Sequence, residues 1–443
     1  MIVIKILMFI LSLSLLVFIH ELGHYIAARI FGVKVEKFYI FFDAWGFSLL
    51  KFKIGETQFG IGWIPFGGYC KISGMIDESM DTEQMKQPAK PDEFRSKPAW
   101  QRLIIMTGGV IMNVILAIIV YIGFSYTQGD NYIANDDLKY GYYFNDLGHE
   151  AGFRDGDKVL TVDGEHIENY LNVYKKILIG AVPPVEVMRD GATMTVSVPE
   201  EMIEKMLTDP TFMRPRIPFV IGDTMAGMPA TQAGILPGDS LVAIDSVQTI
   251  FFDQYSRIFG ERKGKTAEIT VARDSAGVEV LRTMQVTISD EGTIGVYPMS
   301  PAHFFPIRHI SYNFWQAIPA GVRKTGTEIS DYWDQVKMIF KPKTGAYKSL
   351  GGFVTIGSIF PDTWDWSAFW SITAFLSIIL AVMNILPIPA LDGGHVLFLL
   401  WEVVTGRKPS DKFMEWATMI GLLLVVALVL FANANDIYRL FTK

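Results

Sequence analysis

The chain has 443 residues, of which half are hydrophobic and only 19% are charged. This composition is unusual for a soluble protein of this length and favours a membrane protein. The formal net charge of −7 and the absence of a basic run argue against a nucleic-acid partner. The single cysteine, Cys70, excludes an intrachain disulfide and a zinc site built from several cysteines.

Four apolar stretches approach the roughly 20 residues that a helix needs to cross a bilayer. They predict transmembrane helices at residues 1–32, 101–127, 366–404 and 413–435. The first stretch could instead be a signal peptide, but it has a weak positive region and no small-residue cleavage signature. We therefore interpret it as a helix that is retained.

Lysine and arginine residues predict the orientation of these helices, because cytoplasmic loops carry an excess of them. They concentrate between the first two helices, at residues 32–102, and in the short link before the fourth helix, at 407–412. Both segments should be cytoplasmic. The long segment 128–365 and both chain termini should then be extracytoplasmic.

Residues 33–100 show a different pattern, in which short runs of β-branched and aromatic residues alternate with glycines, as in "VKVEKFYIFF" and "TQFGIGWIPFGGYCKISGM". They predict a membrane-associated, β-rich segment, with a polar loop from Asp77 to Lys97. Since lipid does not tolerate exposed sheet edges, the sheet should face protein or a water-filled cavity. A free strand edge there could also pair with an unfolded substrate segment.

The extracytoplasmic segment contains an internal repeat. The stretch "AGFRDGDKVLTVDGEHI" begins at Ala151, and "AGILPGDSLVAIDSVQTI" begins at Ala233 with the same order of Ala-Gly, Gly-Asp and apolar-Asp pairs. Such self-similarity indicates two copies of one supersecondary unit. The motif resembles that of bacterial, circularly permuted PDZ domains, which implies PDZ domains at residues 128–215 and 216–300. They could bind extended peptides, or they could serve only as lids or spacers.

Residues 301–365 follow the second repeat. Apolar and aromatic residues at helical spacing predict an amphipathic helix at the outer interface, with Trp315 and Trp333 as anchors. The stretch "SLGGFVTIGSIF" then predicts a Gly-rich loop near the membrane.

The first helix carries the motif H-E-x-x-H as His20-Glu21-Leu22-Gly23-His24. Residues four apart lie on one face of a helix, so the two imidazoles can converge on one zinc ion. Glu21 is placed to take a proton from a water molecule at the metal. Ionisable residues inside a membrane helix are costly and are functional by default, although these could also snorkel past the cytoplasmic interface.

A catalytic zinc site usually has three protein ligands, and the extended motif that would supply a third histidine is absent. Asp392 is one of the few carboxylates in an apolar segment. Pro387 and Pro389 cannot continue a regular helix, and broken spanning helices are tolerated where they line a cavity. The sequence thus predicts an unwound stretch facing the site, between Asn384 and Asp392.

The combination of H-E-L-G-H in the first helix and N-x-x-P-x-P-x-L-D-G-G in the third resembles the site-2 protease family of intramembrane zinc metalloproteases. With a PDZ pair between the second and third helices, the chain resembles the bacterial regulator of sigma-E protease group. The resemblance implies Zn²⁺ as cofactor. The implied roles are metal ligands for His20, His24 and Asp392, general base for Glu21, and substrate binding for Asn384, Pro387 and Pro389. We interpret His395 as a packing or supporting residue.

The resemblance further implies a location in the bacterial inner membrane, with the active site toward the cytoplasmic side. Its implied substrates are single-pass membrane proteins, namely anti-sigma factors and remnant signal peptides, already trimmed by an upstream site-1-type protease.

The sequence therefore predicts a polytopic α-helical membrane protein with four transmembrane helices and a membrane-associated β-sheet, plus two extracytoplasmic α+β PDZ domains. Two alternatives stay open. One is a membrane-anchored zinc protease that acts on soluble peptides. The other is a PDZ scaffold, or a metal or proton transporter, without protease activity.

Overall fold

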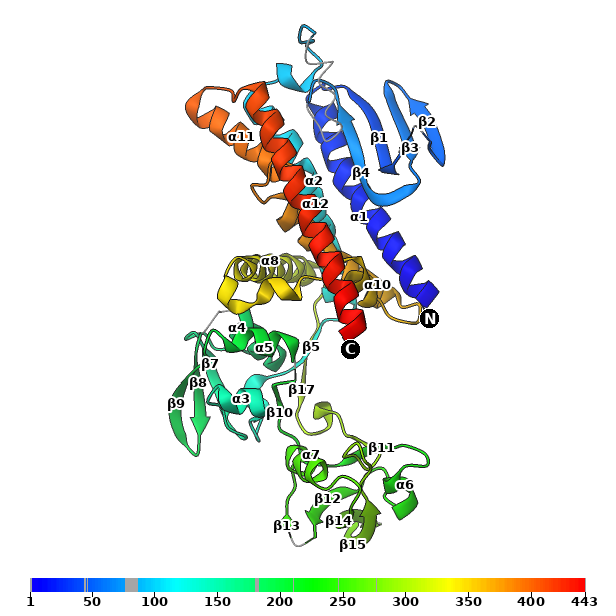
Figure 1. Ribbon diagram of the computed structural model, residues 1–443, viewed down its shortest axis with the longest axis vertical. Helices are drawn as coiled ribbons and strands as arrows, with labels where there is room; N and C mark the ends of the chain where they lie inside the picture. Colours follow the sequence, from blue (N-terminus) through cyan, green and yellow to red (C-terminus); the bar gives the residue numbers. More distant parts are fainter. Residues whose placement is uncertain are drawn as a thin grey trace. The chain divides into compact units, whose positions relative to one another are not determined.

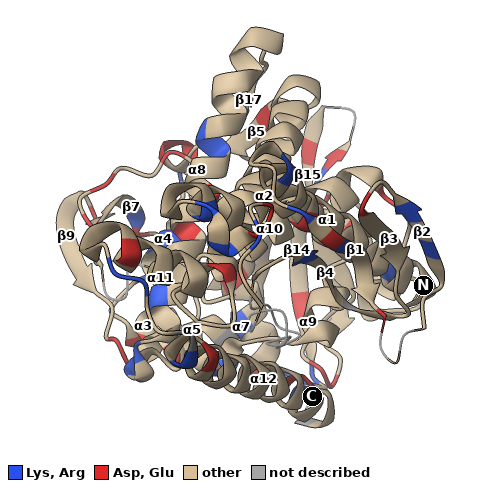
Figure 2. Cartoon of the chain, turned by 90° about the horizontal axis from the view of Figure 1, so that it is seen from above, with Lys and Arg blue, Asp and Glu red and all other residues tan. Residues whose placement is uncertain are grey.

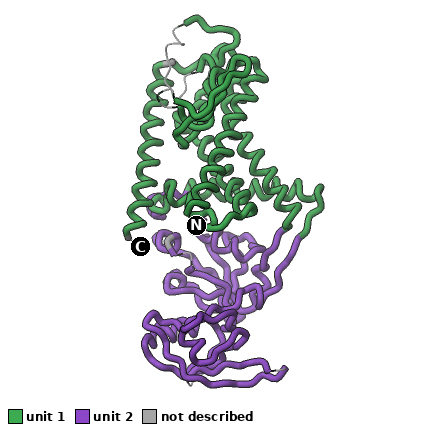
Figure 3. The backbone as a smooth tube through the Cα atoms, turned by 90° about the vertical axis from the view of Figure 1, so that its right-hand side faces the viewer, with its two compact units in different colours: residues 1–129, 311–337, 347–443 green, residues 130–310, 338–346 purple. Residues whose placement is uncertain are grey.

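The computed structural model describes residues 2–43, 45, 47–75, 87–179, 183–209, 211–245, 247–275 and 277–442. The chain forms two compact units, which Figure 3 distinguishes by colour. Unit 1 comprises Met1–Gly129, Ser311–Lys337 and Tyr347–Lys443, and unit 2 comprises Asp130–Ile310 and Met338–Ala346. Part of the expected polar loop, residues 77–86, lies outside the described residues.

Among the described residues, four helices of unit 1 are long and apolar enough to cross a membrane. They are α1 (Ile2–Ile30), α2 (Ala99–Thr127), α10 (Trp366–Asn384) and α12 (Asp411–Thr442). Figure 2 shows α12 as a largely uncharged helix. The prediction of four spanning helices is thus confirmed, although the last helix extends beyond the expected residue 435.

A four-stranded sheet follows α1, as the alternation of aromatic and β-branched residues predicts. Its strands β1 (Val35–Phe42), β2 (Leu50–Ile54), β3 (Thr57–Ile61) and β4 (Ile64–Ile72) are arranged in the order β2-β3-β1-β4. The strands β1 and β3 are parallel, and the other two pairs are antiparallel. Figure 1 shows the sheet alongside α1. The edge strand β4 passes so close that a Cβ on Gly68 would lie 2.5 Å from Val17 Cγ1.

Small and polar residues hold the spanning helices together. The backbones of α1 and α2 meet at Gly23 and Gly108, where a Cβ on Gly23 would lie 2.2 Å from the Gly108 carbonyl oxygen. The buried hydroxyls of Ser12 on α1 and Thr373 on α10 are 2.9 Å apart. Such close approaches and interhelical hydrogen bonds are typical of helix packing in membranes.

The third membrane segment is broken, as its prolines predict. Helix α10 ends at Asn384, and helix α11 (Asp392–Thr405) begins at Asp392. Residues 385–391 form the break between the two helices. After the break, the start of α11 packs closely against the residues that follow α10. This contact requires glycine, because a Cβ on Gly393 would lie 2.2 Å from the Leu386 carbonyl oxygen. The break therefore places Asp392 at the first position of a new helix.

The amphipathic helix α8 (Phe314–Ile339), which the sequence predicts, belongs to unit 1 up to Lys337. The short helices η3 (Phe94–Ser96) and α9 (Phe353–Ser358) are parts of unit 1, and η7 (Ala346–Ser349) belongs to it from Tyr347. The Gly-rich stretch is therefore not wholly a loop. Helix α9 forms because the Asp436 carboxylate on α12 accepts the Thr355 backbone N–H at 2.9 Å. This tertiary contact has no local sequence signal.

Unit 2 contains both copies of the repeat. The first segment contains η4 (Asn135–Asp137), β6 (Tyr142–Phe144), α3 (Asp146–Glu150), β7 (Lys158–Val162), α4 (Tyr170–Ile179), β8 (Pro184–Arg189), β9 (Ala192–Ser197), α5 (Met202–Thr208) and β10 (Met213–Pro215). The second contains β11 (Ile221–Thr224), α6 (Pro229–Ala233), β12 (Ser240–Ile244), β13 (Val247–Gln248), α7 (Phe252–Glu261), β14 (Thr266–Ser275), β15 (Val278–Thr287), β16 (Val296–Pro298) and η5 (Pro301–His303). The sheets β7-β8-β9 and β13-β12-β14-β15 correspond. The strands β5 (Asp130–Ile133) and β17 (Ile307–Ile310) pair with each other, and η6 (Pro342–Thr344) completes the unit.

The Gly-Asp motif has the same structural role in both copies. Asp157 and Asp239 are each 1% exposed. Arg189 pairs with Asp157 at 2.7 Å, and Arg273 pairs with Asp239 at 2.7 Å. Each arginine also donates to the carbonyl oxygen of the glycine in the preceding Ala-Gly pair. The repeated residues thus build the same buried ion pair twice.

Candidate metal centre

The H-E-x-x-H motif lies in the last third of α1, where the helix spacing brings its two histidines together. His20 and His24 are 7% and 6% exposed, and their Nε2 atoms are 3.3 Å apart. The Nδ1 atom of His24 lies 2.9 Å from the Ile105 carbonyl oxygen of α2. A carbonyl can only accept, so Nδ1 carries the proton and Nε2 keeps a free lone pair.

Asp392 approaches the same point from the start of α11. Its Oδ2 atom is 3.2 Å from His20 Nε2 and 3.3 Å from His24 Nε2. This oxygen is buried and has no hydrogen-bond partner. A buried carboxylate oxygen without a partner is costly, and a cation between the three donor atoms would remove that cost.

The three donor atoms fit the tetrahedral geometry of zinc. With zinc–ligand distances of about 2.0–2.1 Å, two ligands of a tetrahedral ion are about 3.3 Å apart. In the structure the three donor atoms are 3.2, 3.3 and 3.3 Å apart, which matches this ligand–ligand distance for all three pairs. Two imidazole nitrogens and one carboxylate oxygen are also a donor set that zinc accepts, with a fourth position left open.

A cavity of ≈ 650 Å³ adjoins these three residues. It is lined by Glu21 and Asn384 and by residues of β4, including the glycine pair Gly67-Gly68. The backbone N–H of Cys70 on β4 hydrogen-bonds to Glu21. The edge strand β4 therefore meets the glutamate of the motif inside the cavity.

Not all the residues that the sequence singled out lie at this cavity. Asn384 does, with its Nδ2 atom 3.3 Å from His20 Nε2. His395 lines the cavity but is not part of the metal-binding group. Pro387 and Pro389 are not among the cavity-lining residues; they break the helix, and their substrate contact stays a prediction. Two further histidines, His149 and His166, contact aspartates of unit 2.

The contribution of α2 to the site was missed by sequence reasoning. Gly109 lies directly against both imidazoles, and a Cβ there would be 2.5 Å from His24 Nε2 and 2.6 Å from His20 Cε1. The only available signal was the small-residue pair Gly108-Gly109 in an apolar helix. That signal is ordinary for helix packing and does not indicate a metal site.

Comparison of the sequence with known proteins identifies the family of this chain. The profile of peptidase family M50 matches residues 8–428. The chain is 27% identical to the regulator of sigma E protease of Haemophilus influenzae, and the match covers 98% of each chain. Proteins named for zinc metalloprotease activity in Neisseria meningitidis and Borreliella burgdorferi are each 28% identical, again over 98% of both chains.

Proposed function

This chain belongs to peptidase family M50 and is an intramembrane zinc metalloprotease of the site-2 type, and we propose that His20, His24 and Asp392 hold its zinc ion. The observation that carries the proposal is the triangle of donor atoms at tetrahedral spacing, set among spanning helices beside a cavity. Family membership disfavours the scaffold and transporter alternatives, which have no use for a hydrolytic glutamate.

The chain's own residues divide the work of hydrolysis. Zinc, when bound, polarises the scissile carbonyl and lowers the pKa of water. Glu21 is the general base: it accepts a proton from the attacking water and returns it to the leaving amine. The Cys70 N–H holds the glutamate side chain in place. The Asn384 amide, at the cavity wall, holds the main chain of an unwound substrate.

The substrates are single-pass membrane proteins, whose helical peptide bonds must unwind before water can reach them. The strand β4 supports this proposal, because it lies at the edge of the described sheet beside β1 and several of its residues line the cavity. We propose that an unwound substrate segment binds in an extended form along β4 within the cavity. Apolar side chains at the far edge of the sheet, such as Phe52 at 48% and Ile54 at 62% exposed, suit a sheet immersed in the membrane interface.

We further propose that the two repeats of unit 2 are PDZ domains that exclude bulky ectodomains. The repeated order of elements and the duplicated buried ion pairs support two copies of one domain. Substrates then need prior trimming by an upstream protease. We propose anti-sigma factors and remnant signal peptides as the substrate class, as the resemblance to the regulator of sigma-E protease group implies.

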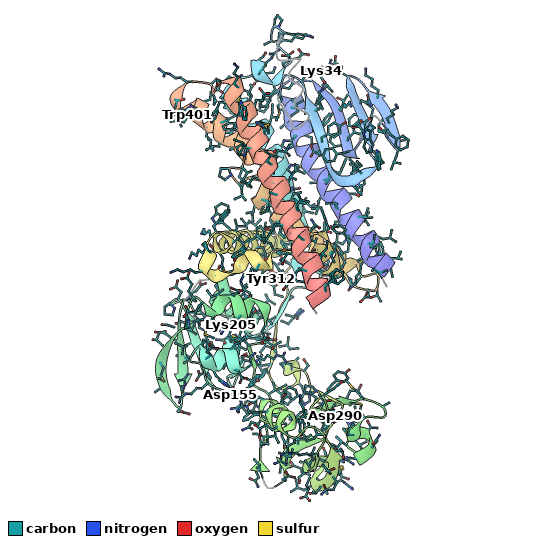
Figure 4. The ribbon with its side chains drawn as sticks, viewed as in Figure 1. Lys34, Asp155, Lys205, Asp290, Tyr312 and Trp401 are labelled. Atoms are coloured by element: carbon teal, nitrogen blue, oxygen red, sulfur yellow. The ribbon has the colours of Figure 1, made fainter. Side chains whose placement is uncertain are left out.

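The proposed orientation places the metal centre toward the cytoplasmic side of a bacterial inner membrane. Figure 4 shows Lys34 and Trp401 at one end of unit 1 and Tyr312 at the opposite end. The basic segments that follow α1 and α11 thus share one end, as the excess of positive charge on cytoplasmic loops requires. PDZ domains and both termini are extracytoplasmic in this orientation.

The test is cleavage of a tagged single-pass membrane protein with a truncated ectodomain, in cells that make either the wild type or Glu21→Gln. The proposal expects a cytoplasmic fragment with the wild type and none with the variant. An otherwise identical substrate with its ectodomain intact should resist cleavage. Equal processing by both proteins, over several truncated substrates, would contradict the proposal.

A further inference from the structure

Asn113 on α2 is a buried polar residue at the metal centre to which the proposed hydrolysis gives no role. Its side chain is fully buried, at 0% exposed. Its Nδ2 atom lies 3.1 Å from His20 Nδ1, and its Oδ1 atom is buried without a hydrogen-bond partner. A lone unpaired amide oxygen in an apolar interior is costly, so the arrangement requires an explanation.

A half-turn of the Asn113 amide gives this oxygen a partner and moves the Nδ2 group to the position that Oδ1 occupied. The turn exchanges Oδ1 and Nδ2 in nearly the same volume, and Oδ1 then faces His20 Nδ1. With Nδ2 facing it, His20 Nδ1 would have to be an unprotonated acceptor, and Nε2 would carry the proton. With Oδ1 facing it, Nδ1 carries the proton, and Nε2 is free to bind a metal.

His24 provides the precedent within the same site. Its Nδ1 atom faces the Ile105 carbonyl oxygen, which fixes the tautomer that binds metal through Nε2. Ile105, Gly109 and Asn113 are spaced by four residues on α2 and therefore share one face. Gly109 leaves room for both imidazoles, while the residues one turn to either side can each take an Nδ1 proton.

We propose that Asn113 is a positioning residue that accepts the Nδ1 proton of His20 through Oδ1 and so holds His20 in its zinc-binding tautomer. This inference rests on the proposed metal centre and deepens it. Metal-binding histidines in proteins generally donate their second nitrogen to such a partner, and loss of the partner typically costs about 10- to 100-fold in metal affinity. One face of α2 thereby orients both histidines of α1.

The experiment measures zinc affinity of the full-length protein in detergent by competition with a chelator. Asn113→Leu keeps the approximate volume but has no acceptor, and about 10- to 100-fold weaker zinc binding is expected. Asn113→Asp keeps an acceptor, and zinc affinity at or above that of the wild type is expected. If Asn113→Leu does not fold, Asn113→Ala takes its place with the same expected loss.

Ser377→Ala is the matched control. Ser377 on α10 is also fully buried, and its hydroxyl donates to the backbone oxygen of Asn113 at 2.8 Å, without contacting His20. This variant disturbs the same helix contact and should bind zinc like the wild type. Equal affinities for Asn113→Leu and Ser377→Ala, or an equal loss for Asn113→Asp and Asn113→Leu, would overturn the inference.

A second readout observes the proton itself. In the cobalt-substituted protein, each imidazole that binds through Nε2 and donates through a protected Nδ1–H gives a slowly exchanging, paramagnetically shifted proton signal. The wild type should give two such signals, and Asn113→Leu should keep that of His24 and lose that of His20. Retention of both would overturn the inference, whereas a wild type that binds no metal would refute the proposed centre itself.

Discussion

Gly109→Ala is predicted to weaken metal binding at least about 100-fold by adding a single methyl group. The new Cβ would lie 2.5 Å from His24 Nε2, whereas an ordinary contact begins at 3.4 Å, so the imidazole or the helix must move. The required displacement is about 0.9 Å, which greatly exceeds the tolerance of about ±0.2 Å for zinc–ligand distances. The new Cβ would also lie only 2.6 Å from His20 Cε1. The two imidazoles are already in contact, so neither ring can move away from the Cβ toward the other.

The assay compares zinc affinity and substrate cleavage for Gly109→Ala and Gly123→Ala. Gly123 lies on the same helix, but a Cβ there meets nothing within 4 Å. Gly109→Ala should bind zinc at least about 100-fold more weakly and lose cleavage in proportion, while Gly123→Ala should match the wild type. Zinc affinity for Gly109→Ala equal to that of Gly123→Ala would refute the view that α2 fixes the histidines rigidly.

Three further substitutions test other parts of the structure. Arg189→Ala removes the ion-pair partner of the buried Asp157 and should destabilise the first repeat by about 3–5 kcal/mol. Hydrogen exchange measures this loss, with the second repeat as internal reference. Arg273→Ala should instead destabilise the second repeat and leave the first unchanged. Gly393→Ala drives a Cβ into a carbonyl oxygen and should displace Asp392, which will appear as zinc loss without unfolding. Asp436→Ala removes the contact that fixes α9, so limited proteolysis of that segment should become faster than in the wild type.

Sequence reasoning succeeded where the signal is local. The four-residue spacing of His20 and His24 requires only a helix, and the prolines at 387 and 389 are sufficient to predict a break before Asp392. The sequence also predicts that this unwound stretch faces the site, although His24 and Asp392 are 368 residues apart in the chain. The structure brings them within 3.3 Å.

The remaining features depend on tertiary packing, which leaves no comparable local pattern. Gly109 and Asn113 look like ordinary residues of a small-residue membrane helix, and only their position opposite α1 brings them to the histidines. The Gly-rich stretch was expected to be a loop, but a carboxylate on α12 stabilises a short helix there. The repeat motif was recognisable, whereas the arginine that pairs with each Gly-Asp motif lies more than 30 residues downstream.

Zinc content, determined together with cleavage, shows whether His20, His24 and Asp392 hold zinc while Glu21 acts as the base. The measurement uses purified wild type, Glu21→Gln and Asp392→Ala, with metal content determined after dialysis against a weak chelator. We expect about one zinc per chain in the wild type and in Glu21→Gln, with cleavage only in the wild type, and neither zinc nor cleavage in Asp392→Ala. Full zinc content and cleavage in Asp392→Ala would contradict the account.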